Sequence, residues 1–154
     1  MSAENKKDSR WLEILGLATV VVSVLLLAWQ IRQNTQTATA QAMLNLNTMA
    51  NEVLSAEAQS AQLAAVLVKG EEDLESLSPV EYRQFQSHVY ASINAIKAAH
   101  GFFTEGILDE VAFSGWRDYT CPYLGGSSVN AIYESFKPTW GTEFVAFVEE
   151  TCGF

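Results

Sequence analysis

Hydrophobic residues are arranged in two different ways along the chain. Residues 14–31 form an unbroken run of eighteen uncharged residues, mostly Leu, Val and Ala, with Trp11 and Trp29 near its two ends. From Met43 onward, hydrophobic residues recur instead every three or four positions. A helix of about eighteen residues, rising about 1.5 Å per residue, covers most of a hydrocarbon core about 30 Å thick. The pattern therefore predicts a transmembrane helix over 14–31 and amphipathic helices after it.

A short polar tail, residues 1–13, precedes the run and contains Lys6, Lys7 and Arg10. A basic segment of this kind also begins a secretory signal peptide, which is the alternative to a retained anchor. The run is longer than the usual apolar region of a signal peptide, and the WQIRQNTQ segment has no A-x-A-like cleavage site. Both features favour a retained membrane anchor.

The basic residues around the run predict its orientation. Lys6, Lys7 and Arg10 lie before it, whereas Arg32 alone follows it closely and the next basic residue is Lys69. Cytoplasmic flanks of membrane helices are enriched in Lys and Arg. We therefore expect the N-terminus in the cytoplasm and the C-terminal domain in the periplasm.

The apolar run continues into a polar segment that contains no helix-breaking residue. Gly and Pro are absent between Leu17 and Val68, and the NTQTATAQ segment is polar but uncharged. We predict a helix that leaves the membrane as a stalk over 32–56, followed by a helical soluble domain over 57–154.

The second half of this polar segment is amphipathic. Its spaced hydrophobic residues continue past a break that we place near Ser55, and Gly70 is expected to end the helix after Lys69. These spaced positions are Leu46, Ala50, Val53 or Leu54, Ala61, Ala64 and Val68.

The LSPVEY segment is the clearest helix start in the chain. Ser78 is the expected N-cap, with Pro79 at the first helical position and Glu81 completing a capping box. This helix is expected to end near Gly106. Its apolar stripe consists of Tyr82, Phe85, Val89, Ser92, Ile96, Ala99 and Phe103.

Three further segments complete the predicted domain. In ILDEVAFSGW, Asp109 is the expected N-cap of a helix. The CPYLGGSS segment is predicted to be a loop, after which Ser127 or Ser128 starts a short helix through Phe136. Thr142 is expected to cap a last helix. Because no alternating strand pattern occurs, the sequence predicts an all-α protein: an N-terminal transmembrane helix that continues into a stalk helix, then a compact helical domain.

Charge is distributed as unevenly as hydrophobicity. From Gln33 onward the chain has fifteen Asp or Glu and five Lys or Arg, a net charge of −10. This acidic character argues against binding to nucleic acid or to an anionic lipid surface. Cys121 and Cys152 match neither a CxxC motif nor a metal-ligand cluster. Outside the cytoplasm they are expected to pair as a disulfide, and in the cytoplasm they would remain reduced thiols.

Four segments occur in a recognisable order: QIRQNTQTATAQA after the span, LESLSPVEYRQF, EGILDEVAFSGWRDY and the terminal TEFVAFVEE. With these segments the chain resembles a family of uncharacterised small bacterial membrane proteins that have one N-terminal span and a compact helical domain. The resemblance implies this architecture and a single-pass protein of the bacterial inner membrane. It implies no catalytic activity.

No catalytic, cofactor or metal motif stands out in the sequence. His88 and His100 are twelve residues apart, about 18 Å along a helix, so they cannot bind one ion within a protomer. Each is expected to be a packing residue. Glu105, Asp109 and Glu110 lie close together, but a cap and a first-turn position account for the last two. We therefore predict a non-enzymatic protein with no catalytic residue, cofactor or metal.

Two functions are compatible with these features. The leading interpretation is a membrane-anchored interaction or scaffold module, whose partners are the lipid bilayer and either a second copy or another membrane protein. The alternative is an envelope sensor that binds a small amphipathic ligand among the aromatic residues of the C-terminal half. In that case Arg117 and Lys137 would contact the anionic end of the ligand.

One face of the predicted membrane helix is a candidate contact for self-association. Gly16, Thr19 and Ser23 share this face at helical spacing, and Gln30 extends it. Small residues let two helix backbones approach closely in a membrane. Beyond the membrane, the polar residues that continue the contact are Gln33, Thr37 and Gln41.

Overall fold

The computed structural model describes residues 4–153, with side chains for residues 11–153. The described residues form α-helices and one short 3-10 turn, η1, with no β-strand, so the predicted all-α class is confirmed. By contact, the chain divides into two compact units, Met1–Ala40 and Gln41–Phe154. In chain order the elements are α1 (Glu4–Gln59), α2 (Ala61–Glu72), η1 (Leu74–Ser76), α3 (Pro79–Thr104), α4 (Glu110–Leu124), α5 (Ser127–Trp140) and α6 (Thr142–Cys152).

The first unit is the N-terminal part of α1 and buries no apolar side chain among its described residues. All side chains of residues 11–31 are exposed, including those of Leu17, Leu25 and Trp29. Residues 11–59 of α1 include a stretch long and apolar enough to cross a membrane, by length and composition. The candidate span predicted from the sequence is therefore helical. The basic residues of the predicted tail lie outside the described side chains.

The break between α1 and α2 lies at Ser60. The Ser60 hydroxyl accepts a hydrogen bond from the backbone N–H of Leu63 at 3.1 Å, which caps α2. The break predicted near Ser55 was therefore wrong, because Ser55 lies inside α1 and the capping hydroxyl comes five residues later. Residues 41–59 of α1 belong to the second unit, together with the helical domain.

Gly70 does not end α2, contrary to the prediction from sequence. The helix continues to Glu72, and Asp73 is its C-cap. A Cβ atom at Gly70 would lie 2.4 Å from Cδ2 of Phe85 on α3, closer than van der Waals packing allows. Glycine is thus present because the two helices approach closely there. For the same helix, Val68 was expected in the core but is exposed.

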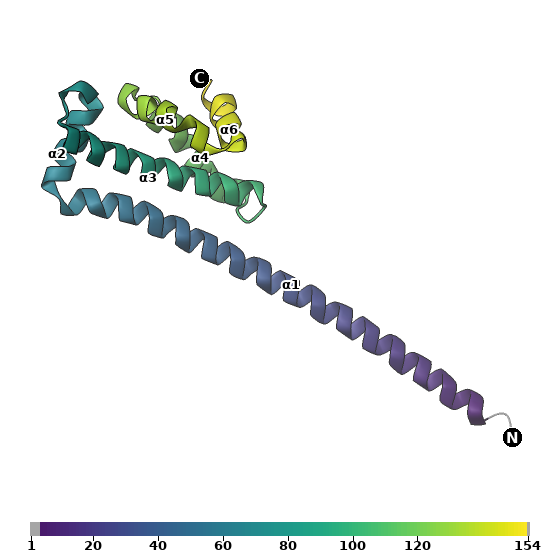
Figure 1. The fold of residues 1–154 in the computed structure, drawn as a ribbon. Helices are drawn as coiled ribbons and strands as arrows, with labels where there is room; N and C mark the ends of the chain where they lie inside the picture. Colours follow the sequence, from purple (N-terminus) through teal and green to yellow (C-terminus); the bar gives the residue numbers. More distant parts are fainter. Residues whose placement is uncertain (1–3, 154) are drawn as a thin grey trace. The chain divides into compact units, whose positions relative to one another are not determined.

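Helix α3 begins with the predicted capping box. The Ser78 hydroxyl accepts a hydrogen bond from the Glu81 N–H, and the Glu81 carboxylate accepts one from the Ser78 N–H at 2.7 Å. Within the second unit, α3 lies between the last part of α1 and the pair α5–α6 (Figure 1). Most of the predicted apolar stripe is buried, and Ile93, which the prediction omitted, is fully buried as well.

The C-terminal helices are longer than predicted. Asp109 caps α4 as expected, but α4 continues through Pro122 to Leu124, so most of CPYLGGSS is helical. Likewise α5 continues through Pro138 to Trp140. Each proline lies two residues before the end of its helix, where the loss of one N–H donor interrupts little of the helix. The N-cap of α6 is a glycine with φ +85°, and Thr142 is the first helical residue rather than the cap.

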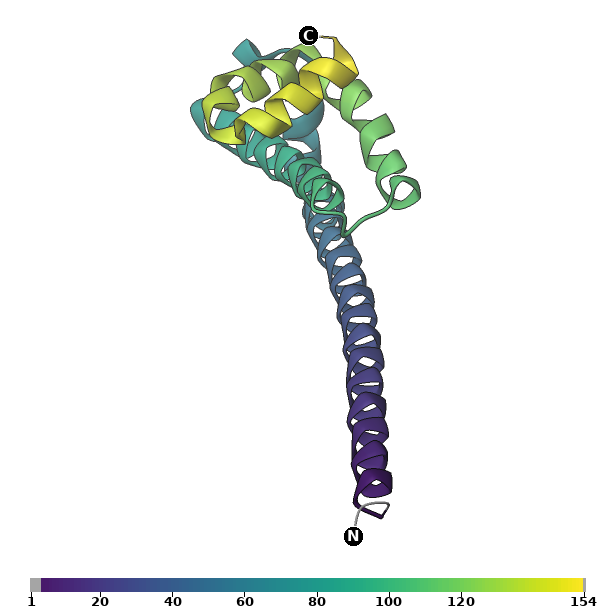
Figure 2. The same ribbon diagram turned by 90° about the vertical axis from the view of Figure 1, so that its right-hand side faces the viewer.

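The hydrophobic core is formed by α2, α3, α5 and α6 with the end of α4. Figure 2 shows the backbones of these helices gathered together. Trp140 is the largest fully buried side chain of this core, and its indole N–H donates to the Tyr133 carbonyl at 3.0 Å. A smaller cluster joins Leu46 of α1 to Ala99 and Phe113. The domain therefore has a full core of its own, whereas the first unit has none among its described side chains.

Candidate functional site

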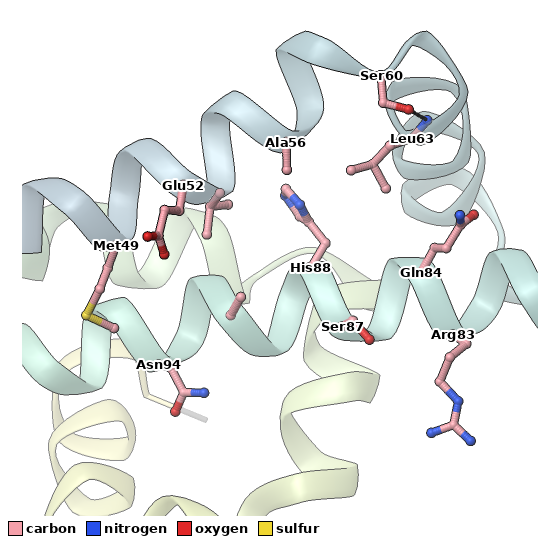
Figure 3. Close-up of a pocket in the computed structure, with 12 residues that line it drawn as sticks. Met49, Glu52, Ala56, Ser60, Leu63, Arg83, Gln84, Ser87, His88 and Asn94 are labelled. Atoms are coloured by element: carbon pink, nitrogen blue, oxygen red, sulfur yellow. Dashed lines mark hydrogen bonds between the residues drawn. The ribbon is translucent and has the colours of Figure 1, made fainter.

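A groove of ≈ 690 Å³ lies between the last part of α1 and α3. Figure 3 shows its two walls, with Met49 and Glu52 extending from α1 and His88 reaching from α3 toward Ala56. We call it the α1–α3 groove. Its lining residues are Met49, Glu52, Val53, Ala56, Ser60, Leu63, Arg83, Gln84, Ser87, His88, Ala91 and Asn94.

The groove exists because α1 is held to the domain at two places. Ala42 and Leu46 are buried, and Leu46 packs in one cluster with Ala99. The other attachment is the turn at Ser60, where the chain enters α2. Between these points no side chain of α1 is fully buried. The two helices therefore leave space between them that their own side chains do not fill.

The groove combines an apolar surface with a few polar groups. Gln84 Oε1 is buried and accepts no hydrogen bond within the described residues. Arg83 forms no ion pair within the described residues, and its guanidinium points away from α1 in Figure 3. Burial lowers the pKa of His88, against the opposing effect of Glu57 and Glu71, so its imidazole is neutral at neutral pH. A mainly apolar partner with hydrogen-bond donors fits such a surface.

A second, smaller hollow of ≈ 230 Å³ is lined by residues of α1, α2, α3 and α4 and by Val129 of α5. Val53 and His88 line both this hollow and the α1–α3 groove. Glu57 of α1 and Glu71 of α2 also line it, and the two tyrosines of α4 complete its wall. We call it the glutamate–tyrosine hollow.

The two cysteines lie on α4 and α6, and the structure joins them. The Sγ atoms of Cys121 and Cys152 are 2.08 Å apart and the Cα atoms 5.3 Å apart. This Cα separation is within the normal range for a disulfide. The bond closes a loop that contains all of α5 and fastens the last helix to the domain.

The residues predicted for helix association in the membrane are all exposed on α1. The Thr19 hydroxyl donates to the Leu15 carbonyl and the Ser23 hydroxyl to the Thr19 carbonyl, each at 2.8 Å. Their donors are thus satisfied within the helix, an arrangement that lipid surroundings would require of a membrane span. A Cβ atom at Gly16 would meet open space within 4 Å, and Gln30 is exposed. None of these four residues packs against another described part of the chain.

The aromatic C-terminal half is mainly core. Tyr133 and Trp140 are buried, which leaves them unavailable to a ligand. Arg117, expected to contact an anionic ligand, forms an ion pair with Glu110, and Lys137 pairs with two carboxylates. The proposed anion contacts are therefore already occupied by side chains of the same domain.

His100 packs as the sequence predicted. It is 8 % exposed and its ring stacks on Phe147 with the centroids 4.4 Å apart. Burial lowers its pKa, and Glu143 opposes this shift. Within residues 11–153, no three His, Cys, Asp or Glu side chains are arranged to hold a metal ion. Glu110, one of the clustered carboxylates, pairs with Arg117 instead.

Sequence reasoning missed both the groove and the hollow. Hydrophobic spacing predicted an amphipathic second half of α1, but residues 32–56 were expected to form a stalk outside the soluble domain. The signal for the hollow was the pair Glu57 and Glu71, which lie on either side of the helix break without a basic residue beside them. Comparisons of the chain with protein-family models, curated proteins and solved structures found no match.

Proposed function

We propose that this protein is a membrane-anchored, non-enzymatic interaction module of the bacterial inner membrane. Its helical domain binds a helix of another envelope protein in the α1–α3 groove. The observation that carries the proposal is the contrast between an α1 that leaves apolar residues 11–31 exposed and a domain that buries its own core. A long exposed apolar surface is stable in a bilayer and unstable in water.

The groove supports the binding part of the proposal. Helix-in-groove recognition requires a mainly apolar channel between two helices, with polar groups along its edges. Met49, Val53 and Leu63 provide apolar contacts, while Ser87 and Asn94 provide polar groups along the groove. An amphipathic partner helix with a Ser, Thr or Asn beside its apolar stripe would match both the apolar and the polar lining residues.

The periplasmic orientation is supported by two features. Basic residues are concentrated before the span, as cytoplasmic flanks require. The pairing of Cys121 with Cys152 also fits an oxidising compartment. Protease added to spheroplasts should therefore digest the domain, and both cysteines should resist alkylation until a reductant is added. Digestion only after lysis would place the domain in the cytoplasm.

The anchor is tested by replacing Leu25, in the middle of the exposed apolar stretch, with Arg. The unmodified chain should stay in the membrane fraction after an alkaline carbonate wash. A charge at the centre of a span costs about 2.5–3.5 kcal/mol of insertion free energy. The variant should therefore be partly released, whereas Gln59→Arg, at the end of α1, should not be. Equal retention of both variants would contradict the membrane anchor.

The groove is tested by site-specific photocrosslinking in intact cells. A photoreactive residue at Ala56 lies on the groove wall, and the matched control is Val111, an exposed residue of α4 outside the groove. Ala56 should give an adduct with one protein, identified by mass spectrometry, that Val111 does not give. Adducts with a second copy of this chain would replace the proposed partner by a homo-oligomer.

Direct binding then decides whether the groove is the contact. The crosslinked protein is purified, and its affinity for the full-length chain in detergent is measured. Ala91→Glu introduces a charge into the groove and should weaken binding at least tenfold, about 1.4 kcal/mol. Val111→Glu adds the same charge elsewhere and should have no effect. If both variants bind like the unmodified chain, the groove is not the interface.

A sensor function is the second candidate, and the size of the groove favours it. Its ≈ 690 Å³ lies within the range of about 300–1,000 Å³ that small-molecule sites occupy. This candidate predicts that native mass spectrometry of the purified chain detects a retained small amphipathic molecule. Ala91→Glu should then abolish retention of that molecule.

A further inference from the structure

The glutamate–tyrosine hollow has the shape of a site for a very small ligand. Its ≈ 230 Å³ is below the range of about 300–1,000 Å³ found for drug-sized ligands. Helices α1 to α5 all contribute to its walls, and its apolar surface comes from residues such as Leu67, Phe85 and Val89. Phe85 and Val89 belong to the hydrophobic core, so this part of the surface is continuous with the packed interior.

The charge of the hollow is negative and unbalanced. Glu57 and Glu71 line it, and neither forms an ion pair within the described residues. No Lys or Arg lines the hollow, and the nearest basic residue in sequence, Lys69, pairs with Glu81 at 3.0 Å. Both carboxylates also raise the pKa of Tyr119, after the larger effect of burial. A cation entering the hollow would therefore gain two carboxylate contacts without displacing a side-chain cation.

The wall that α4 contributes to the hollow is aromatic. The rings of Tyr119 and Tyr123 stack with their centroids 5.3 Å apart and their planes at 21°. Burial raises the pKa of Tyr123 to about 12, so its phenol stays neutral at all physiological pH values. Neutral tyrosine rings attract ammonium groups through their π faces, by about 0.5–2 kcal/mol.

The geometry points to an organic cation rather than a metal ion. Glu57, Glu71 and His88 all line the hollow, but within residues 11–153 no three such side chains converge as metal ligands do. We propose that the hollow binds a small organic cation, an aliphatic amine or a quaternary ammonium group, between the carboxylates of Glu57 and Glu71 and the rings of Tyr119 and Tyr123. This site adjoins the partner contact proposed for the groove, because Val53 and His88 line both, but its charged and aromatic residues do not line the groove.

Titration calorimetry on the full-length chain tests the site with two probes, 1,4-diaminobutane and tetramethylammonium. A maltoside detergent is used because phosphatidylcholine headgroups are themselves quaternary ammonium ions. Saturable binding of either probe with a Kd below about 10 mM is expected. Selective binding of tetramethylammonium would indicate a trimethylammonium source such as a lipid headgroup, and selective binding of the diamine a free amine. The uncharged analogue 1,4-butanediol should not bind.

Matched variants separate a site from general attraction to an acidic protein. Glu57→Gln combined with Glu71→Gln should weaken binding at least tenfold. Glu72→Gln combined with Glu75→Gln removes the same charge close to Glu71, at positions that line neither the hollow nor the groove, and should change Kd less than twofold. Tyr119→Phe should retain binding and Tyr119→Leu should weaken it. Thermal melting of each variant checks its fold.

Two results would overturn the proposal. One is the absence of saturable binding of both probes to the unmodified chain. The other is an equal loss of affinity in the two double variants, which would mean that the acidic surface as a whole attracts the cation. Neither result bears on the groove, because the crosslinking positions Ala56 and Val111 lie outside the hollow.

Discussion

The two units of this chain are both helical, yet their helices are stabilised in opposite ways. In residues 11–31 every side chain is exposed, although most are Leu, Val or Ala. In residues 41–153 comparable side chains are buried, with Trp140, Ile93 and Ile96 at 0 % exposure. Apolar side chains of the same types thus form an exposed surface in one unit and a buried core in the other.

Helix caps distinguish the two units, whereas hydroxyl bonding does not. In the first unit, the hydroxyls of Thr19 and Ser23 donate to carbonyls four residues earlier. In the second unit, the hydroxyls of Thr48, Ser92 and Thr120 do the same. The hydroxyl of Ser60 and the carboxylate of Asp109 instead accept from backbone N–H groups and cap helices where the domain turns its chain. The exposed apolar side chains of residues 11–31, and not the hydroxyls, therefore set the first unit apart.

The largest effect should come from removing the largest fully buried side chain of the domain. Trp140→Ala leaves a cavity and removes the hydrogen bond to the Tyr133 carbonyl. The free energy of unfolding of the domain should therefore fall by about 3–5 kcal/mol. Trp29→Ala, in the first unit, should leave the free energy of unfolding of the domain unchanged. Chemical denaturation of the full-length chain in detergent measures both. Equal destabilisation by the two substitutions would refute the division into separately stabilised units.

The disulfide should have the next largest effect. It joins residues 31 positions apart, and a loop of that length implies about 3–4 kcal/mol of stabilisation through the lost entropy of the unfolded chain. Replacing Cys121 and Cys152 with Ser should lower the denaturant midpoint of the domain by a corresponding amount. Membrane retention of the chain should not change, because the anchor contains no cysteine. An unchanged midpoint would mean that the bond does not constrain the unfolded chain.

Local sequence signals predicted the helix starts, while tertiary packing determined the features that prediction missed. Ser78 and Asp109 cap their helices because a cap depends on only three or four neighbouring residues. The local sequence around Gly70 is typical of a helix end. Glycine is required there, however, because the ring of Phe85, fifteen residues later, leaves no room for a Cβ atom. Likewise the groove depends on how far α1 lies from α3, and residue spacing carries no information about that distance. The candidate sites were therefore beyond sequence reasoning, although the class of the fold was not.

Glycine substitutions test the difference between the two units at single positions. Gly70→Ala places a Cβ 2.4 Å from the buried Phe85 ring, so overpacking should destabilise the domain by about 1–3 kcal/mol. Gly101→Ala, in α3 with open space around it, should stabilise by about 0.5–1 kcal/mol. Gly16→Ala, in the first unit, should not alter domain unfolding. Denaturant midpoints of the three variants provide the measurement, and a gain in stability for Gly70→Ala would show that Phe85 moves freely.

The smallest effect expected is a pH dependence that only the second unit contributes. Burial lowers the pKa of His100 from its ordinary value of 6.5, with Glu143 opposing the shift, and burial lowers that of His88 as well. Because their pKa values are lower in the folded chain, the two histidines bind protons at a higher pH in the unfolded chain than in the folded chain. The free energy of unfolding therefore falls as the pH falls from 6.5 through the lowered pKa values. His100→Gln should reduce this slope, and adding His88→Gln should reduce it further. Denaturation at a series of pH values, from the lowered pKa values up to about pH 8, measures this dependence. At about pH 8 both histidines are neutral in the folded and unfolded chain. If the free energy of unfolding of the double variant still depends on pH in this range, other groups cause the dependence.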